Sequence, residues 1–330
     1  MVHDVVSIGN PLMDVLIEVE EEFLKELNLI KGNMHLMDEN QIKEIEMKLE
    51  KFKKKFSPGG SEANTLAALS MLGQRVVYFG KVGQDSHGET YHKKLIENGV
   101  MSKVIKVDGM TGRAITFITP DSERTFATHL GVAPLLEDNE LNEADIMGAK
   151  FLHLTGYIFY SENTKKAALQ ALNIAKNNNV KVCLDLADPN CVKVNKDILK
   201  KVTKEYVDII IANEKEAKEF TGKEPEEAVN ELAKLVDIAI VKIGAKGSLI
   251  QSKDKLIRIP GFKAKAIDTT GAGDIYTAGF LYGMLNNMDL ETSGRIASFI
   301  ASKVVQIKGA RLDKMPHEEI KKLMKNVNSE

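Results

Sequence analysis

The segment Asp268-Thr-Thr-Gly-Ala-Gly-Asp274 places two glycines and an acid where an apolar helix is predicted to begin. Because Gly271 and Gly273 lack side chains, backbone N–H groups there can approach an anion closely. The first turn of a helix adds unpaired N–H groups and the positive end of the helix dipole. Asp274 would then be close enough to accept a proton from an attacking hydroxyl. The segment predicts phosphoryl transfer to an alcohol; the alternative is a glycine turn with Asp274 satisfying the dipole.

Other short segments place polar side chains or glycines in loops. Gly9-Asn-Pro-Leu-Met-Asp14 supplies the Asn10 amide and the Asp14 carboxylate, and a carboxylate can accept two hydrogen bonds from a vicinal diol. Each segment, taken alone, could also be a turn or a helix cap. The remaining segments are Pro58-Gly-Gly-Ser-Glu-Ala-Asn64, Asp121-Ser-Glu-Arg-Thr-Phe126, Asn213-Glu-Lys-Glu216 and Lys242-Ile-Gly-Ala-Lys-Gly247.

Short apolar runs alternate with amphipathic segments along most of the chain and would position these residues. The runs are rich in Val and Ile and apolar on both faces, which is typical of parallel strands covered on both sides. Strand–helix alternation predicts one α/β domain over residues 1–330, with a doubly wound, mostly parallel sheet flanked by helices. Strands are predicted at 5–8, 76–79, 151–154, 180–186, 207–211 and 238–243, and helices at 89–98, 163–178, 226–235 and after Gly273 and Leu290.

Two further helices are predicted from their caps. Asp38 is expected to cap one helix, with Gln41 at the capping-box position and an apolar stripe that runs to Phe56. Ser61 is expected to cap the next, which would end near Gly73.

Two stretches, residues 15–37 and 112–128, read instead as alternating, half-exposed strands, the second with a Pro120-Asp-Ser turn. Strands with one polar face suit a small separate sheet that closes as a lid over the main domain. Edge hairpins are the alternative.

Composition limits the classes of partner. The chain has 330 residues, with 45 Lys plus Arg against 47 Asp plus Glu, so no net charge draws it to nucleic acid or anionic membranes. Its two cysteines, Cys183 and Cys191, form no metal-binding or disulfide pattern. No signal peptide or long apolar run is seen, so a cytoplasmic protein is expected. The sequence leaves the oligomeric state open between a monomer and a homodimer.

The sixteen residues that begin at Asp268 closely resemble the C-terminal signature of the ribokinase-like carbohydrate and purine kinase family. The other segments match family landmarks in the right order, so the resemblance runs nearly end to end. It implies a ribokinase-like fold with a small β-rich lid, and ATP with Mg²⁺ as cosubstrate and cofactor. Relatives also bind K⁺ beside the anion hole through residues near Asp268, although this sequence does not itself show a K⁺ site.

The resemblance implies a role for each matching residue. Asp274 would be the base, with the Gly271, Ala272 and Gly273 amides as the anion hole and Arg124 as a lid arginine that reaches the phosphates. The alternative for Arg124 is a surface ion pair with Glu123 or Asp121. Acceptor contacts would come from Asn10, Asp14, Gly59, Gly60 and Asn64, nucleotide contacts from Asn213, Glu216, Lys242, Gly244 and Gly247, and the contact to water-bound Mg²⁺ from Glu216.

Within the family the likeness is greatest to adenosine kinases, because of the wording of Gly9–Asp14 and the 44 residues between Asp14 and Gly59. It implies phosphorylation of a nucleoside 5′-hydroxyl, with adenosine favoured and a sugar as the alternative. Leu36, Met37 and Tyr157 are candidate contacts of the base, or else ordinary packing residues. Asn190 stands where adenosine kinases often have an aromatic residue, so another nucleoside or a free sugar stays open.

Overall fold

A nine-stranded sheet forms the centre of the protein in the computed structural model, which describes residues 2–121, 123–253 and 255–326. Seven strands run parallel in the order β6-β5-β1-β9-β10-β11-β12, and β13 and β14 extend one edge antiparallel. The predicted fold class and all six predicted strands are confirmed. The strands are β1 (His3–Ile8), β5 (Val76–Gly83), β6 (Met101–Val107), β9 (Ala149–Thr155), β10 (Lys181–Asp185), β11 (Ile209–Asn213), β12 (Ile238–Lys242), β13 (Gly247–Ser252) and β14 (Lys255–Pro260).

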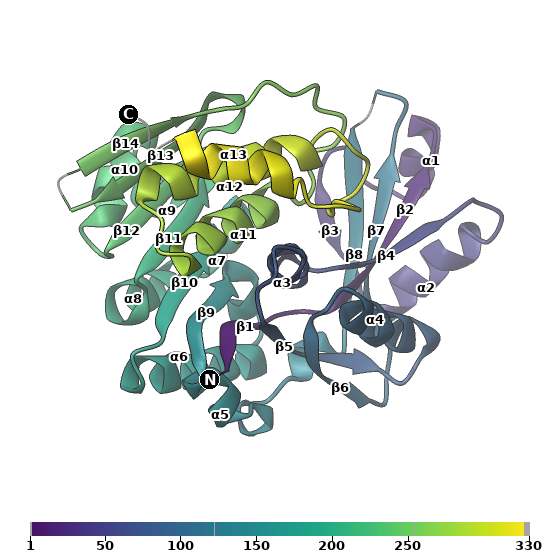
Figure 1. Cartoon of the computed structure of the whole chain (residues 1–330). Helices are drawn as coiled ribbons and strands as arrows, with labels where there is room; N and C mark the ends of the chain where they lie inside the picture. The colour runs from purple at the N-terminus through teal and green to yellow at the C-terminus, as the bar shows by residue number, and fades with distance from the viewer. Residues whose placement is uncertain (1, 122, 254, 327–330) are drawn as a thin grey trace.

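Helices cover both faces of this sheet and enclose two apolar cores (Figure 1). Burial on both sides explains why the strands are apolar throughout rather than alternating. One face carries α3 (Ser61–Met71), α4 (Ser86–Glu97), α11 (Ala272–Leu285), α12 (Leu290–Val304) and α13 (His317–Asn326). The other carries α5 (Glu143–Met147), α6 (Glu162–Asn177), α7 (Pro189–Val194), α8 (Lys196–Tyr206), α9 (Glu214–Thr221) and α10 (Pro225–Ala233). No helix in these ranges is long and apolar enough to cross a bilayer.

A second, five-stranded sheet stands beside the large one as the lid (Figure 1). One of its faces packs Val15, Ile17, Ile115 and Phe117 against two helices, and the opposite face carries Asp14 toward the main domain. Its strands follow the order β3-β8-β7-β2-β4. They are β2 (Leu12–Glu18), β3 (Met34–Leu36), β4 (Lys55–Gly59), β7 (Thr111–Ile118) and β8 (Arg124–Gly131), and the helices are α1 (Glu21–Glu26) and α2 (Glu39–Lys48).

The structure corrects several details of the lid prediction. The Asp38–Gln41 capping box is present, but α2 ends at Lys48, and Phe56 lies on β4, which pairs with β2. Residues 15–37 contain helix α1 as well as strands, because Leu24 completes the lid core. Of the predicted Pro120-Asp-Ser turn, Ser122 lies outside the described residues.

The predicted cap of α3 is also wrong. Gly60 is the N-cap residue, with a φ of 90° that favours glycine, and Ser61 is the first helical residue. The Ser61 hydroxyl makes no cap hydrogen bond and points to Asp274 instead.

Candidate active site

A cavity of about 1340 Å³ opens where the carboxyl ends of the parallel strands meet the lid. Asp185, Asn213 and Lys242 end β10, β11 and β12 at this edge of the sheet. Asp14 enters the cavity from the lid, and Asp274 from the start of α11. Parallel α/β sheets bind ligands at this edge, because the loops that follow the strands converge there.

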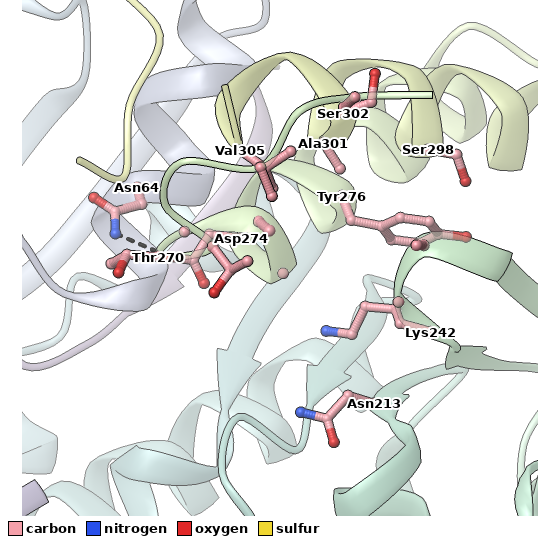
Figure 2. A pocket seen from close by; sticks show the side chains of 18 of the residues that line it. Asn64, Asn213, Lys242, Thr270, Asp274, Tyr276, Ser298, Ala301, Ser302 and Val305 are labelled. Carbon is pink, nitrogen blue, oxygen red and sulfur yellow. Dashed lines mark hydrogen bonds between the residues drawn. The ribbon is translucent and has the colours of Figure 1, made fainter. Parts of the chain in front are cut away.

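Two side chains from α3 hold the Asp274 carboxylate. The Ser61 hydroxyl donates to Oδ1 at 2.5 Å, and Asn64 Nδ2 donates to Oδ2 at 2.9 Å, as drawn in Figure 2. Burial raises the pKa of Asp274 to about 6, although these two hydrogen bonds oppose the rise. Asp274 is therefore largely ionised at neutral pH and poised near the pH at which a general base works best.

The amides of the predicted anion hole lie at the N-terminus of α11, beside a lysine. Gly271 is the N-cap residue with a left-handed φ of 74°, and a Cβ there would lie 2.5 Å from Ala310 O. A Cβ at Gly273 would meet only Lys242 Nζ, at 3.1 Å. The space in front of the helix terminus is thus bordered by a cation, which suits phosphate oxygens.

Lys242 projects into this space from the end of β12 (Figure 2). A buried ion pair with Asp185 supports it. Its Nζ donates to Asp185 Oδ2 at 2.8 Å, and Thr277 Oγ1 donates to the same oxygen at 3.0 Å. Burial opposes the charge of Lys242, but Asp185 and Glu216 raise its pKa above the ordinary value. Lys242 is therefore a fixed cation at neutral pH.

Asn213 and Glu216 form a capping box at the start of α9. The Asn213 side chain accepts from Glu216 N at 2.9 Å, and Glu216 Oε2 accepts from Asn213 N at 2.7 Å. Both residues also line the cavity, so the cap and the predicted ligand contact are compatible. Burial raises the pKa of Glu216.

Arg124 reaches across from lid strand β8 to the anion-hole segment. One terminal nitrogen donates to Thr270 Oγ1 at 2.6 Å, and the other pairs with the Asp268 carboxylate. The ion pair with Glu123 or Asp121 is thus not formed. Asp268 also accepts from Thr270 N and Gly309 N. Because its oxygens already face a guanidinium and two amides, this donor set does not fit K⁺ at Asp268.

The acceptor end of the cavity is lined by Asp14, Gly60, Asn64, Phe126 and Tyr157. The Asp14 carboxylate lies directly against Gly59, because a Cβ added to that glycine would lie 2.2 Å from Asp14 Oδ1. Burial raises the pKa of Asp14 to about 7, opposed by the charge of Arg311.

Besides Gly59, which lies against Asp14, three predicted acceptor residues are not among those that line the cavity. Asn10 is buried next to the cavity, where Nδ2 donates to Tyr157 O at 3.5 Å and Oδ1 has no partner. Leu36 lies on edge strand β3 with 58% of its surface exposed, and Met37 packs against the lid core. Neither is among the residues that line the cavity.

The end of the cavity that is predicted to bind the nucleotide carries several glycine, alanine and serine residues. Gly244 and Gly247 border the turn between β12 and β13, and the latter has a φ of 104° with Ile259 O only 1.9 Å from an added Cβ. Ser298, Ala301 and Ser302 face them from α12 (Figure 2). These small side chains leave room at this end of the cavity.

Sequence reasoning missed Ser61 as a partner of Asp274, the strand-end carboxylate Asp185, Phe126, and Arg311. Asp185 carried a usable signal, because an acid at the end of a buried strand points to the site edge. Ser61 and Arg311 carried none, since they meet the site only through contacts between residues more than 200 positions apart.

Comparisons with known proteins agree with this geometry. The model of the pfkB family carbohydrate kinases matches residues 26–318. A 5-dehydro-2-deoxygluconokinase of Bacillus subtilis is 32% identical over 280 residues, which make up 81% of this chain and 86% of that protein. The solved adenosine kinase of Sinorhizobium meliloti superposes with a TM-score of 0.90 at 28% identity, covering 98% of this chain and 99% of that chain. A probable sugar kinase of Rhizobium etli CFN 42 gives 0.90 at 28% identity, covering 97% and 98%.

The family match spans most of the chain and agrees with the order of the site segments. The predicted base and the predicted phosphate contacts line one cavity, as phosphoryl transfer to a hydroxyl requires. The chain therefore belongs to the pfkB family of carbohydrate kinases, as a kinase of a sugar or a nucleoside.

Proposed function

We propose that this kinase transfers the γ-phosphoryl group of ATP to the 5′-hydroxyl of a nucleoside, with adenosine as the favoured acceptor. Asp274 removes the hydroxyl proton, the oxygen bonds to the γ-phosphorus, and the bond to the leaving ADP oxygen breaks. The products are the nucleoside monophosphate and ADP. The Gly271–Gly273 amides, Lys242 and Arg124 stabilise the charge on the phosphoryl group in transit.

The observation that carries the proposal is that Asp14, from the lid, and Asp274, from the main domain, line the same cavity. Asp14 can accept hydrogen bonds from a ribose diol while Asp274 receives the proton from the 5′ end. Phe126 and Tyr157 add aromatic surface to the same space, as a purine base requires. The likeness to a solved adenosine kinase, at a TM-score of 0.90, is compatible with this acceptor, and a probable sugar kinase gives the same score.

Mg²⁺ also fits the nucleotide end of this cavity. Glu216 lines that end and would hold the ion through water, whereas the Asp185 oxygens already accept from Lys242, Thr277 and Ala187 N. No cluster of three or more possible metal-ligating side chains occurs in the described part of the chain. One or two carboxylates suit a Mg²⁺ ion that keeps several waters and binds substrate phosphates. When bound, such an ion neutralises part of the charge on the phosphates.

An acceptor panel tests the proposal. Initial rates with ATP are measured for adenosine, inosine, guanosine, ribose, fructose and 5-dehydro-2-deoxygluconate, and NMR of the product locates the phosphate. We expect adenosine to give the highest kcat/KM and the 5′-monophosphate as product. A sugar that is phosphorylated in place of adenosine would overturn the nucleoside assignment.

A matched pair of acceptors tests the role of Asp14. 2′,3′-Dideoxyadenosine keeps the base and the 5′-hydroxyl but lacks the diol. Leaving the Asp14 carboxylate unpaired costs about 1.5–3 kcal/mol, so kcat/KM should fall by about 10- to 100-fold. The variant D14N should raise the KM for adenosine and leave the KM for ATP near that of the wild type.

The second candidate is a carbohydrate kinase. It is favoured by the 32% identity to a protein named 5-dehydro-2-deoxygluconokinase. Asn190 agrees with it, because this exposed residue at the start of α7 provides no aromatic surface. In that case the panel should single out one sugar, and purine nucleosides should not compete with it.

A further inference from the structure

Arg311, on the loop between α12 and α13, lies behind the catalytic base. Its Nε donates to Asn64 Oδ1 at 2.7 Å. Both terminal nitrogens are shielded from solvent, and neither has a hydrogen-bond partner. Because a buried guanidinium is costly to desolvate, its position calls for a role beyond packing.

The contact continues as a chain of hydrogen bonds that ends on the base. Arg311 donates to the oxygen of the Asn64 amide, and the nitrogen of the same amide donates to Asp274 Oδ2 at 2.9 Å. An amide has one accepting and one donating end. Turning the Asn64 amide over would set its oxygen against the carboxylate and its N–H₂ against the guanidinium. Arg311 therefore fixes which end of Asn64 faces the base.

The loop that carries Arg311 is tied to the anion-hole segment. Gly309 N donates to Asp268 Oδ2 at 2.5 Å, and Ala310 fills the space beside Gly271. These contacts place the guanidinium relative to the same segment that carries Asp274. The position of Arg311 is thus fixed relative to both the base and the anion hole.

We propose that Arg311 is a positioning residue for phosphoryl transfer, which orients Asn64 and through it the Asp274 carboxylate. The inference rests on the proposed role of Asp274 as the base. Arg311 does not line the cavity, so the proposal requires no contact with either substrate.

The charges around the base set the direction of the expected pH effect. Asp185, Glu62 and Asp14 disfavour the ionised form of Asp274, whereas Lys242 and Arg311 favour it. Loss of Arg311 removes one of the two cations and frees the Asn64 amide. The carboxylate should then hold its proton to higher pH, so the acid limb of the kcat profile should move upward.

The test compares R311M with the wild type, using adenosine, or the best panel sugar if adenosine gives no rate. We expect kcat to fall about 10- to 100-fold and the acid limb to rise by about one pH unit. The acceptor KM should rise by a smaller factor than kcat falls, because Asn64 also lines the cavity. R258M is the matched control: it removes an exposed arginine on β14 that pairs with Glu226. It should match the wild type in all three quantities.

A double-mutant cycle separates action through Asn64 from an independent effect. If Arg311 acts through Asn64, kcat of N64L/R311M should be no lower than that of N64L. The proposal would be overturned if the two substitutions lowered kcat by the product of their separate factors, or if folded R311M kept the kcat of the wild type. It would also be overturned by an unmoved acid limb or by a loss confined to KM. If R311M does not fold, R311Q replaces it. It removes the charge, so the acid limb should still move upward, and an unmoved acid limb in R311Q would overturn the proposal. A wild type without adenosine kinase activity would overturn the nucleoside assignment but not this role.

Discussion

Replacing Asp274 with Asn should remove most of the activity and at the same time stabilise the fold. Asn cannot accept the proton of the attacking hydroxyl, and general base catalysis contributes about 10²- to 10⁴-fold to such reactions. We therefore expect kcat to fall by that factor. Binding of the acceptor should change little, because the variant is nearly isosteric and Asp14 is untouched.

The gain in stability follows from the cost of burying the charge. The pKa of Asp274 rises from 3.8 to about 6 on folding. The pKa of Asp274 is higher in the folded state than in the unfolded state, so ionisation of Asp274 lowers the free energy of unfolding. This destabilisation begins above pH 3.8 and reaches its full value above pH 6. At about 1.36 kcal/mol per unit, the cost is about 3 kcal/mol at pH 8 and about 1.6 kcal/mol at pH 5. D274N escapes this cost because Asn has no charge.

Thermal unfolding of both proteins at pH 8 and pH 5 checks the arithmetic. At about 2 °C per kcal/mol, D274N should melt about 6 °C above the wild type at pH 8 and about 3 °C above it at pH 5. D237N is the control, because Asp237 is an exposed carboxylate that precedes β12. It should shift neither kcat nor Tm.

Two results would refute this reasoning separately. A kcat for D274N within threefold of the wild type would exclude Asp274 as the base. An equal or lower Tm at pH 8 would show that the donors Ser61 and Asn64 outweigh the burial cost, so that the folded pKa of Asp274 lies at or below its unfolded value.

Other substitutions test the proposed phosphate contacts one residue at a time. K242M should leave Asp185 buried and unpaired, lower the free energy of unfolding by about 3–5 kcal/mol in denaturant titrations, and raise the KM for ATP. R124M should lower kcat by about 10²-fold or more in steady-state assays, because the lid arginine borders the anion-hole segment. G271A should lower Tm, since its Cβ would overlap Ala310, whereas G273A should keep Tm and lower kcat by displacing the lysine next to it. Equal effects of the two glycine variants on Tm would contradict this division.

The parts of the fold that sequence predicts well are those decided locally. The central strands are short Val- and Ile-rich runs buried on both faces, and such a run has few other stable states. The glycine-rich start of α11 was likewise predictable, because a left-handed residue at Gly271 and a small one at Gly273 leave few alternatives to glycine.

The parts that sequence could not predict depend on distant partners. Strand β4 has no alternating apolar pattern and forms because its residues pair with β2, with Ser57 opposite Asp14. Ser61 has the residue type and position of a helix cap, and only the fold shows that its hydroxyl serves Asp274, 213 residues away. Local preferences were overruled at both places by tertiary contacts.

The Gly59–Gly60 pair combines a local backbone requirement with a contact to a distant residue. The lack of a side chain at Gly59 is what allows the Asp14 carboxylate to lie against the backbone, so two motifs 45 residues apart form one unit. Asp14 and Arg124 belong to the lid, whereas Asp274 and Lys242 belong to the main domain. In the proposed mechanism, a movement of the lid would therefore change acceptor recognition and charge stabilisation together. In that mechanism the main domain supplies the base and the phosphate site, and the lid supplies the acceptor contact of Asp14.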